Sequence, residues 1–166
     1  ANLVKKLISN SDVDPGCVLG VGVAVGGLVD AERNRVIYSA TLGWENEDLG
    51  GALEEILERP VRVDHDARVM ALGELSFGIG DHMRNFICVL AGYGIGASFI
   101  VDGRPFYGKQ GMTGELGHLV VAEDSRIECS CGHRGCLDAL ASGRAIGLRA
   151  QKEAAADQKG PLYRLR

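Results

Sequence analysis

Three of the chain's five cysteines lie in one short segment, ECSCGHRGC, and this cluster constrains the fold more than any other feature. Thiols grouped so closely in an otherwise cysteine-poor chain are typical of a metal site in a reducing compartment rather than of a disulfide framework. Gly132 and Gly135 let the backbone bend so that Cys129, Cys131 and Cys136 turn toward one point. The alternative is a group of buried or oxidised thiols, and the metal site is the hypothesis we favour.

A tetrahedral zinc ion needs a fourth nitrogen or sulfur ligand besides the three cysteines. His118, in the segment GELGH, and His133, inside the cysteine loop, are both candidates. His133 sits close between cysteines, so we prefer His118. With all four positions filled by side chains the site would be structural, because no position is open for a reactive water. Cys17 and Cys88 lie in or beside strand-like segments and are interpreted as small core residues.

The composition narrows the class of protein. At 166 residues the chain has the length of one ordinary domain, and its 46% hydrophobic content excludes a disordered polypeptide. The net charge of −4 argues against a surface that binds polyanions over its whole extent. No apolar run is long enough to span a bilayer, and the opening residues do not read as a signal peptide. Both ends stop without a clear finishing element, so we expect a piece of a longer cytoplasmic protein.

Apolar runs alternate with helical spacing along the chain, which predicts an α/β fold. Strands are expected at residues 18–25, 35–38, 61–63, 86–91, 97–101 and 119–122. Helices are expected at residues 3–8, 49–57, 67–77 and 139–156, the last with a break at Ser142–Gly143. Asp66 stands where the N-cap of the third helix would stand.

Acidic and histidine side chains gather where the VRV strand meets the following helix. The order Asp64, His65, Asp66 places a carboxylate where it is able to take a proton from a substrate hydroxyl, although a helix cap fits the position equally well. Glu115 and His118 share the loop before the cysteines, and both are able to hydrogen-bond hydroxyl groups. Taken alone, each of these two is interpreted as an ordinary loop residue.

The segment GYGIG at residues 92–96 joins two predicted strands. Its Gly92, Gly94 and Gly96 would let backbone N–H groups cradle a phosphate, although the same letters fit a plain tight turn. The segment does not match a Walker A loop. It does not match a Rossmann fingerprint either, because that motif must open a helix and this segment lies between two predicted strands. The earlier pair Gly26–Gly27 is a weaker signal of the same kind.

The order of these motifs resembles the ROK family of repressors, open reading frames and sugar kinases. The resemblance rests on GVAVGGLVD, VDHDARVMALGE, AGYGIGASFIVDGRPFYG, GELGH and CSCGHRGCLD, and it covers residues 18 to about 147. It implies the actin-like, ribonuclease-H-like ATPase fold, with a sugar cleft between two lobes. That fold would be incomplete here, because the early DxGGT phosphate segment of the family is absent. Residues 1–65 would be the remainder of the first lobe, and residues 66–166 part of the second.

The same resemblance implies roles for individual residues. The zinc ligands would be His118, Cys129, Cys131 and Cys136. In a kinase, Asp66 would be the base that deprotonates the sugar hydroxyl. The sugar contacts would be Gly27, His65, Asp66, Glu115, His118 and Asp138, and the phosphate loop would be Gly92, Gly94 and Gly96.

Three departures from the kinase pattern bear on function. His65 replaces the usual Asn, Tyr93 the usual Thr of GTGIG, and Asp138 a Glu that is one methylene longer. His at position 65 resembles the regulator branch, and Tyr93 puts a bulky side chain where ATP phosphates should lie.

We therefore predict the sugar-sensing domain of a transcriptional repressor that binds a hexose-type sugar. It would form a homodimer or a higher homo-oligomer and contact DNA through a domain outside this chain. The alternative is an ATP-dependent sugar kinase with Asp66 as general base, which would also need Mg-ATP.

Overall fold

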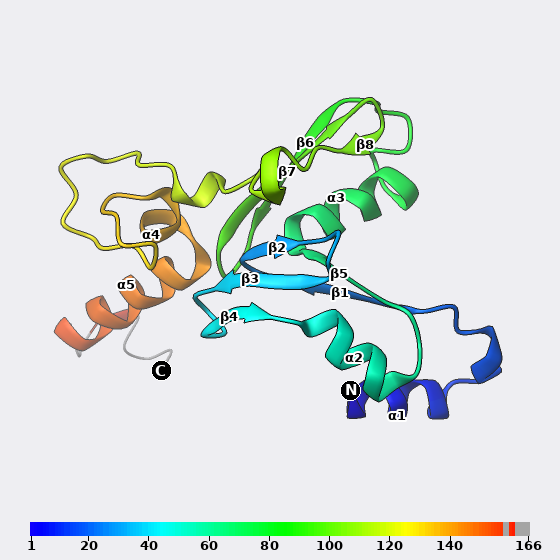
Figure 1. Cartoon of the computed structure of the whole chain (residues 1–166). Helices are drawn as coiled ribbons and strands as arrows, with labels where there is room; N and C mark the ends of the chain where they lie inside the picture. Colours follow the sequence, from blue (N-terminus) through cyan, green and yellow to red (C-terminus); the bar gives the residue numbers. More distant parts are fainter. Residues whose placement is uncertain (158–159, 162–166) are drawn as a thin grey trace.

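The first part of the chain forms two small sheets, and the computed structural model describes residues 1–157 and 160–161 (Figure 1). The parallel sheet consists of β1 (Val21–Val25) and β5 (Val61–His65). The antiparallel sheet consists of β2 (Leu28–Asp30), β3 (Arg35–Ser39) and β4 (Trp44–Glu47). The helical elements of this part are α1 (Asn2–Asn10), the 3-10 turn η1 (Pro15–Cys17) and α2 (Leu49–Leu57).

The core of this part is aliphatic and follows from strand alternation. Val61 and Val63 are fully buried while Arg62 between them is exposed, because successive side chains of a strand point to opposite faces. The buried cluster is Val25, Val29, Val36, Leu57, Val61 and Val63. This packing holds the carboxyl end of β5, where the Asp64–Asp66 segment begins.

The second part is built on one antiparallel sheet. Its strands are β6 (Phe86–Ala91), β7 (Ile95–Val101) and β8 (Arg104–Pro105), and α3 (Asp66–Phe77) packs against β6 and β7. Beyond the sheet come the 3-10 turns η2 (Lys109–Gly111) and η3 (Leu116–His118), then α4 (Leu137–Ala141) and α5 (Gly143–Ala156). Figure 1 shows the long yellow loop beside α4 and α5, on the other side of the molecule from α1.

The α/β class and most of the predicted elements are confirmed, including the break at Ser142–Gly143 between α4 and α5. The predicted strand at 119–122 is wrong, because Val120 makes only an isolated bridge to Cys136. Three apolar residues in a row there lack a partner strand among the described residues and stay largely exposed. β2, β4 and β8 were not predicted, since all three are short and carry polar residues or proline.

Three further predictions need correction. Asp66 is the first residue of α3, and His65 occupies the N-cap position without a side-chain cap bond. Cys17 is exposed and Cys88 is only half-buried, because η1 lies at the surface before β1 begins and β6 has one open face. The expected buried strand at 18–25 begins only at Val21, and its outer face is exposed.

Candidate functional site

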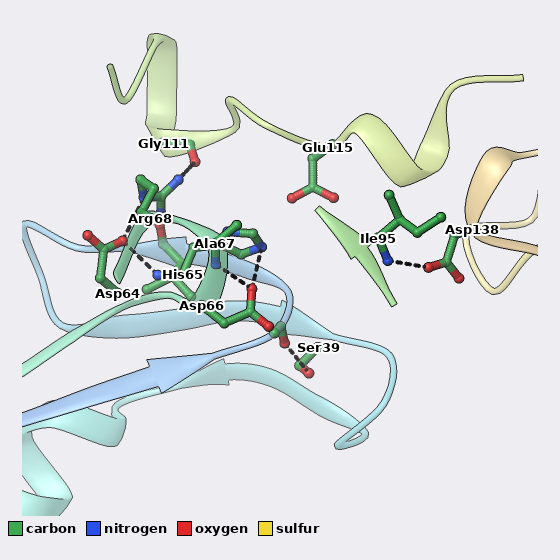
Figure 2. Close-up of polar contacts among 12 residues, drawn as sticks. Ser39, Asp64, His65, Asp66, Ala67, Arg68, Ile95, Gly111, Glu115 and Asp138 are labelled. Atoms are coloured by element: carbon green, nitrogen blue, oxygen red, sulfur yellow. Dashed lines mark hydrogen bonds and ion pairs between the residues drawn. The ribbon is translucent and has the colours of Figure 1, made fainter. Parts of the chain in front are cut away.

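The two carboxylates of the Asp64–Asp66 segment have different environments (Figure 2). Asp64 is largely buried, and its Oδ1 accepts hydrogen bonds from the His65 backbone N–H at 2.7 Å and from Arg68 Nε at 2.7 Å. Its Oδ2 accepts a further bond from the hydroxyl of Tyr107 at 3.1 Å. All of these bonds are internal to the protein and engage both carboxylate oxygens, so Asp64 stabilises the junction between β5 and α3.

Asp66 is the carboxylate that remains available to a ligand. Its side chain is 38% exposed and stands in the first turn of α3. Oδ1 accepts the Ala67 N–H at 2.7 Å and lies 3.4 Å from His65 Nε2. Oδ2 faces Gly26 and has no hydrogen-bond partner within the described part of the chain. Residue order alone left both aspartates open, and the family resemblance pointed to Asp66. In the structure Asp64 is engaged by internal bonds and the Asp66 side chain is partly exposed.

His65 is buried rather than open to solvent, with its side chain only 8% exposed. Its ring lies beside Gly96, because a Cβ built on that glycine would stand 3.3 Å from His65 Cε1. Nδ1 is buried without a hydrogen-bond partner among the residues described. His65 therefore fills the space between Asp66 and the strand that follows the glycine loop.

The turn between β1 and β2 presents backbone to the Asp66 side chain. Ser39 is buried, and its hydroxyl donates a 2.7 Å hydrogen bond to the carbonyl oxygen of Gly26, which holds the turn in place. Gly27 has φ +126°, and a Cβ there would stand 3.0 Å from Cα of Ser39. Only glycine fits both the dihedral angle and the close approach.

The glycine loop at 92–96 is tied to the helices that follow the cysteine loop. The Gly143 and Arg144 N–H groups at the start of α5 donate to the carbonyls of Gly92 and Tyr93, at 2.8 Å and 3.1 Å. The Gly92 N–H is bonded to the Gly94 carbonyl at 2.9 Å. The α5 N-terminus is therefore occupied by the loop itself, and the Tyr93 side chain is exposed.

Asp138 belongs to the same network. Its Oδ1 accepts the Ile95 N–H at 2.8 Å (Figure 2). Its Oδ2 lies 3.9 Å from Arg144 Nη2. With only 14% of its side chain exposed, Asp138 fastens α4 to the start of β7. Aspartate is the length that this contact uses, and a glutamate would carry its carboxylate one methylene farther from Cα.

The predicted metal ligands come together. The ligand atoms of His118, Cys129, Cys131 and Cys136 all lie within 4.8 Å of one another. Cys131 Sγ is 3.7 Å from Cys136 Sγ, and Cys129 Sγ is 3.4 Å from His118 Nδ1. Tetrahedral zinc with bonds of about 2.3 Å separates its sulfurs by about 3.8 Å, so this group fits the ion. His133 is not in the group, although its Nδ1 lies 3.5 Å from Cys131 Sγ.

The thiols of this group differ in acidity. Burial, followed by hydrogen bonds from the neighbouring thiols, raises the pKa of Cys136 to about 12. For Cys131, burial is outweighed by hydrogen bonds from the His133 backbone and from the Cys129 and Cys136 thiols, and its pKa is lowered. A metal ion would hold all three as thiolates, because the thiolate is the ligand form.

His118 also connects this group to Glu115. Its Nδ1 faces the thiols, while its Nε2 lies 3.7 Å from Glu115 Oε2. Figure 2 shows the Glu115 carboxylate pointing from its loop toward the space between the Asp66 junction and the Ile95–Asp138 contact. Both side chains are about one-third exposed. Asp66 and Glu115 are thus two ionisable groups that a polar ligand would reach from opposite segments.

Sequence reasoning missed Arg68 and Tyr107, which hold Asp64. Arg68 was read only as one residue of a helix, yet its guanidinium is buried against three segments. The Asp64–Arg68 spacing of four residues was the available signal for an ion pair. Nothing in the linear order of residues indicated Tyr107, which lies 43 residues from Asp64.

Comparison with known proteins was made at the levels of family, sequence and structure. A family model described as the ROK family matches residues 1–162. The xylose repressor of Caldicellulosiruptor bescii is 34% identical over 145 residues, which are 87% of this chain and 36% of the repressor. A ROK glucokinase from Streptomyces griseus, solved with glucose and AMPPNP, superposes with a TM-score of 0.80 at 31% identity and covers 95% of this chain and 50% of its own.

A ROK family transcriptional regulator, a homologue of the E. coli MLC protein, superposes almost as well. Its TM-score is 0.79 at 28% identity, over 99% of this chain and 41% of its own. The chain spans between 32% and 44% of the length of the curated relatives that it matches. Within residues 1–157 and 160–161, no helix has the length and apolar character needed to cross a membrane.

Proposed function

The chain belongs to the ROK family, and from this premise we propose that it is part of the sugar-sensing domain of a ROK transcriptional regulator. Residues 1–65 would complete the first lobe of an actin-like fold, and residues 66–166 would form part of the second. The observation that carries the regulator assignment is the His65 imidazole, buried between Asp66 and Gly96.

The site supports a polyhydroxylated ligand such as a hexose. Asp66 and Glu115 offer exposed carboxylate oxygens, which accept hydrogen bonds from hydroxyl groups strongly. The Gly26–Gly27 turn offers backbone beside Asp66. His65, beside Asp66, His118, beside Glu115, and Asp138 would complete the sugar contacts.

Two features favour sensing over phosphoryl transfer. The His65 ring fills the space between Asp66 and β7, which narrows the path from the glycine loop to the candidate base. In the loop, the N–H groups of Gly92 and Ile95 already donate to Gly94 and Asp138. Fewer backbone donors are therefore left to cradle a phosphate.

In a regulator, the sugar acts by shifting the equilibrium between two conformations of the protein. It must bind one arrangement of the two lobes better than the other, since a ligand with equal affinity for both shifts nothing. In a homodimer, the preferred arrangement would alter the separation of two DNA-binding heads that lie outside this chain. The xylose repressor among the relatives is consistent with this proposal.

We also assign a structural zinc ion to His118, Cys129, Cys131 and Cys136, on the fit of their spacing to tetrahedral coordination. The ion would close the loop before α4. It would orient His118, whose other ring nitrogen faces Glu115.

A sugar kinase is the second candidate, and one observation favours it. Asp66 Oδ2 is without a hydrogen-bond partner in the part of the chain described, and a free carboxylate oxygen is what a general base requires. In that case Mg-ATP would supply the phosphoryl group, and loop 92–96 would meet its phosphates. The glucokinase relatives are consistent with this alternative.

The test uses the intact protein that carries this chain. Titration calorimetry with glucose, xylose and N-acetylglucosamine measures binding, and ADP release in the presence of Mg-ATP measures turnover. We expect binding of one of these sugars without turnover. Sugar-dependent ADP release that Asp66→Asn abolishes, while sugar binding stays measurable, would establish the kinase instead. Asp12→Asn, at an exposed position in the segment before β1, is the matched control.

A further inference from the structure

Arg68 is a buried cation at the meeting point of four segments. Only 1% of the residue is exposed, although it lies in the first turn of α3. Its Nε donates to Asp64 Oδ1 at 2.7 Å, Nη1 to the Gly111 carbonyl at 3.0 Å, and Nη2 to the Val29 carbonyl at 3.4 Å. The guanidinium is planar, and each of its three nitrogens donates to a different chain segment.

Tyr107 closes the open side of this cluster. Its ring centroid lies 5.0 Å from the Arg68 guanidinium carbon, and its hydroxyl donates to Asp64 Oδ2 at 3.1 Å. Burial, followed by the negative charge of Asp64, raises the pKa of the Tyr107 phenol, so the hydroxyl keeps its proton and remains a donor. Both oxygens of Asp64 are thereby engaged, one by Arg68 and the other by Tyr107.

Each segment held by Arg68 also carries part of the candidate site. Asp64 lies two residues before Asp66, Val29 two residues after Gly27, and Gly111 four residues before Glu115. The last two segments are in direct contact here, because a Cβ on Gly111 would stand 3.0 Å from the Val29 carbonyl oxygen. A shift of any one segment would thus have to break a bond to Arg68.

We propose that Arg68 is a positioning residue, which with Tyr107 sets Asp66, the Gly26–Gly27 turn and Glu115 in one arrangement around the ligand. This inference rests on the proposed function, since it concerns the sugar site. Arg68 does not touch the ligand itself, because it is buried beneath the segments that do.

Simple core packing does not account for this side chain. An apolar residue would fill the same volume without the cost of desolvating a cation, and buried ion pairs are often no more stabilising than apolar replacements. What a guanidinium adds is directional. It fixes three acceptors from separate segments at defined angles, which an apolar contact does not do.

The decisive experiment is a double-mutant cycle on sugar affinity, measured by calorimetry in the intact protein with glucose and xylose. Tyr107→Phe removes only the hydroxyl that donates to Asp64, and it should raise the dissociation constant for the sugar about threefold. Glu115→Gln weakens it directly. If Tyr107 helps to position Glu115, the double variant loses less affinity than the product of the two single losses. Independent losses that multiply would overturn the proposal.

Tyr38→Phe is the matched control, because Tyr38 is also a partly exposed tyrosine but its side chain lies outside this cluster. Its cycle with Glu115→Gln should be multiplicative. A general loss of stability would lower the melting temperature of a variant but would leave the two effects multiplicative. The non-additivity therefore separates positioning from a merely structural role.

Arg68→Lys provides the larger perturbation, since it keeps the charge and loses the three-way geometry. We expect about tenfold weaker sugar binding with an unchanged circular dichroism spectrum. If Arg68→Lys does not fold, the Tyr107 cycle decides. If the unmodified protein binds sugar and both variants bind equally well, the positioning role is overturned while the sensing function stands. If the unmodified protein binds none of the three sugars, the proposed function itself fails.

Discussion

The part of the chain that contains strands β1 to β5 and the loop at residues 119–136 are stabilised by different kinds of interaction. The first buries an aliphatic cluster that includes Val36, Val61 and Val63, and regular strand pairing surrounds it. The buried cluster of the loop region contains only Cys129, Cys136 and Ala139. Apolar burial at about 25 cal/mol per Å² stabilises the first region, whereas the second has little such area to bury.

The hydrogen bonding of the two regions differs in the same direction. The loop makes only the isolated bridges Val120–Cys136 and Glu128–Arg134 and a few turn bonds. Its apolar residues Leu119, Val120 and Val121 remain exposed. A segment with so little buried apolar area needs another interaction to keep it ordered. A metal ion bound by the four clustered ligands would supply that interaction.

The largest expected effect is the loss of the zinc ion that we propose for His118, Cys129, Cys131 and Cys136. Cys136→Ala, or extraction of the ion with a chelator, should abolish metal binding and remove hydrogen-exchange protection across 119–136. A structural zinc ion is worth on the order of 10 kcal/mol to the segment that it folds. Amides of β1 and β5 should keep their protection, which mass spectrometry would resolve by peptide. Cys17→Ala is the control, and equal loss of protection in both regions would contradict the comparison.

The converse change acts on the aliphatic core. Val63→Ala removes two methyl groups from a side chain that is 1% exposed and should lower the free energy of unfolding by about 2 kcal/mol. The metal content of the folded protein should stay at that of the unmodified chain. Urea denaturation and metal analysis measure the two quantities, and Val121→Ala, at an exposed position, should change neither. Metal loss in Val63→Ala would mean that the two regions are one cooperative unit.

A smaller effect is expected at Asp138, which connects the loop region to β7. Asp138→Ala leaves the Ile95 N–H without its acceptor and should cost about 1–2 kcal/mol of unfolding free energy in a urea titration. Asp138→Asn keeps an oxygen at the same place and should cost less. Equal losses in the two variants would show that the charge, which faces Arg144, matters more than the Ile95 bond.

The smallest effect concerns the N-cap of α5. Ser142 is buried, and its hydroxyl accepts the Ala145 N–H at 3.2 Å, so Ser142→Ala should cost about 1 kcal/mol. Ser9→Ala, at an exposed helical position, serves as the control. If the urea midpoint shifts by the same amount in both variants, the Ser142 cap bond does not specifically stabilise the start of α5, which binds loop 92–96.

Local features of this protein were accessible from the residue order. The run VGVAV, the helical spacing after Asp66 and the thiols of ECSCGHRGC each depend on neighbours within a few residues, and the predicted elements follow them. His118 was chosen over His133 by spacing, and the structure groups it with the three cysteines. The sugar and phosphate roles of the candidate residues stay predictions, because they concern molecules outside the chain.

Tertiary contacts decided what identical residue types do at neighbouring positions. Asp64 and Asp66 are the same residue type on either side of His65. Arg68 and the distant Tyr107 hydrogen-bond to Asp64 and leave the Asp66 side chain exposed. The apolar run at 119–121 looks like a strand, but its backbone pairs with a neighbouring segment only through the isolated bridge Val120–Cys136. Spacing along the chain determines periodicity and ligand reach, whereas burial and hydrogen-bond partners depend on segments that meet only after folding.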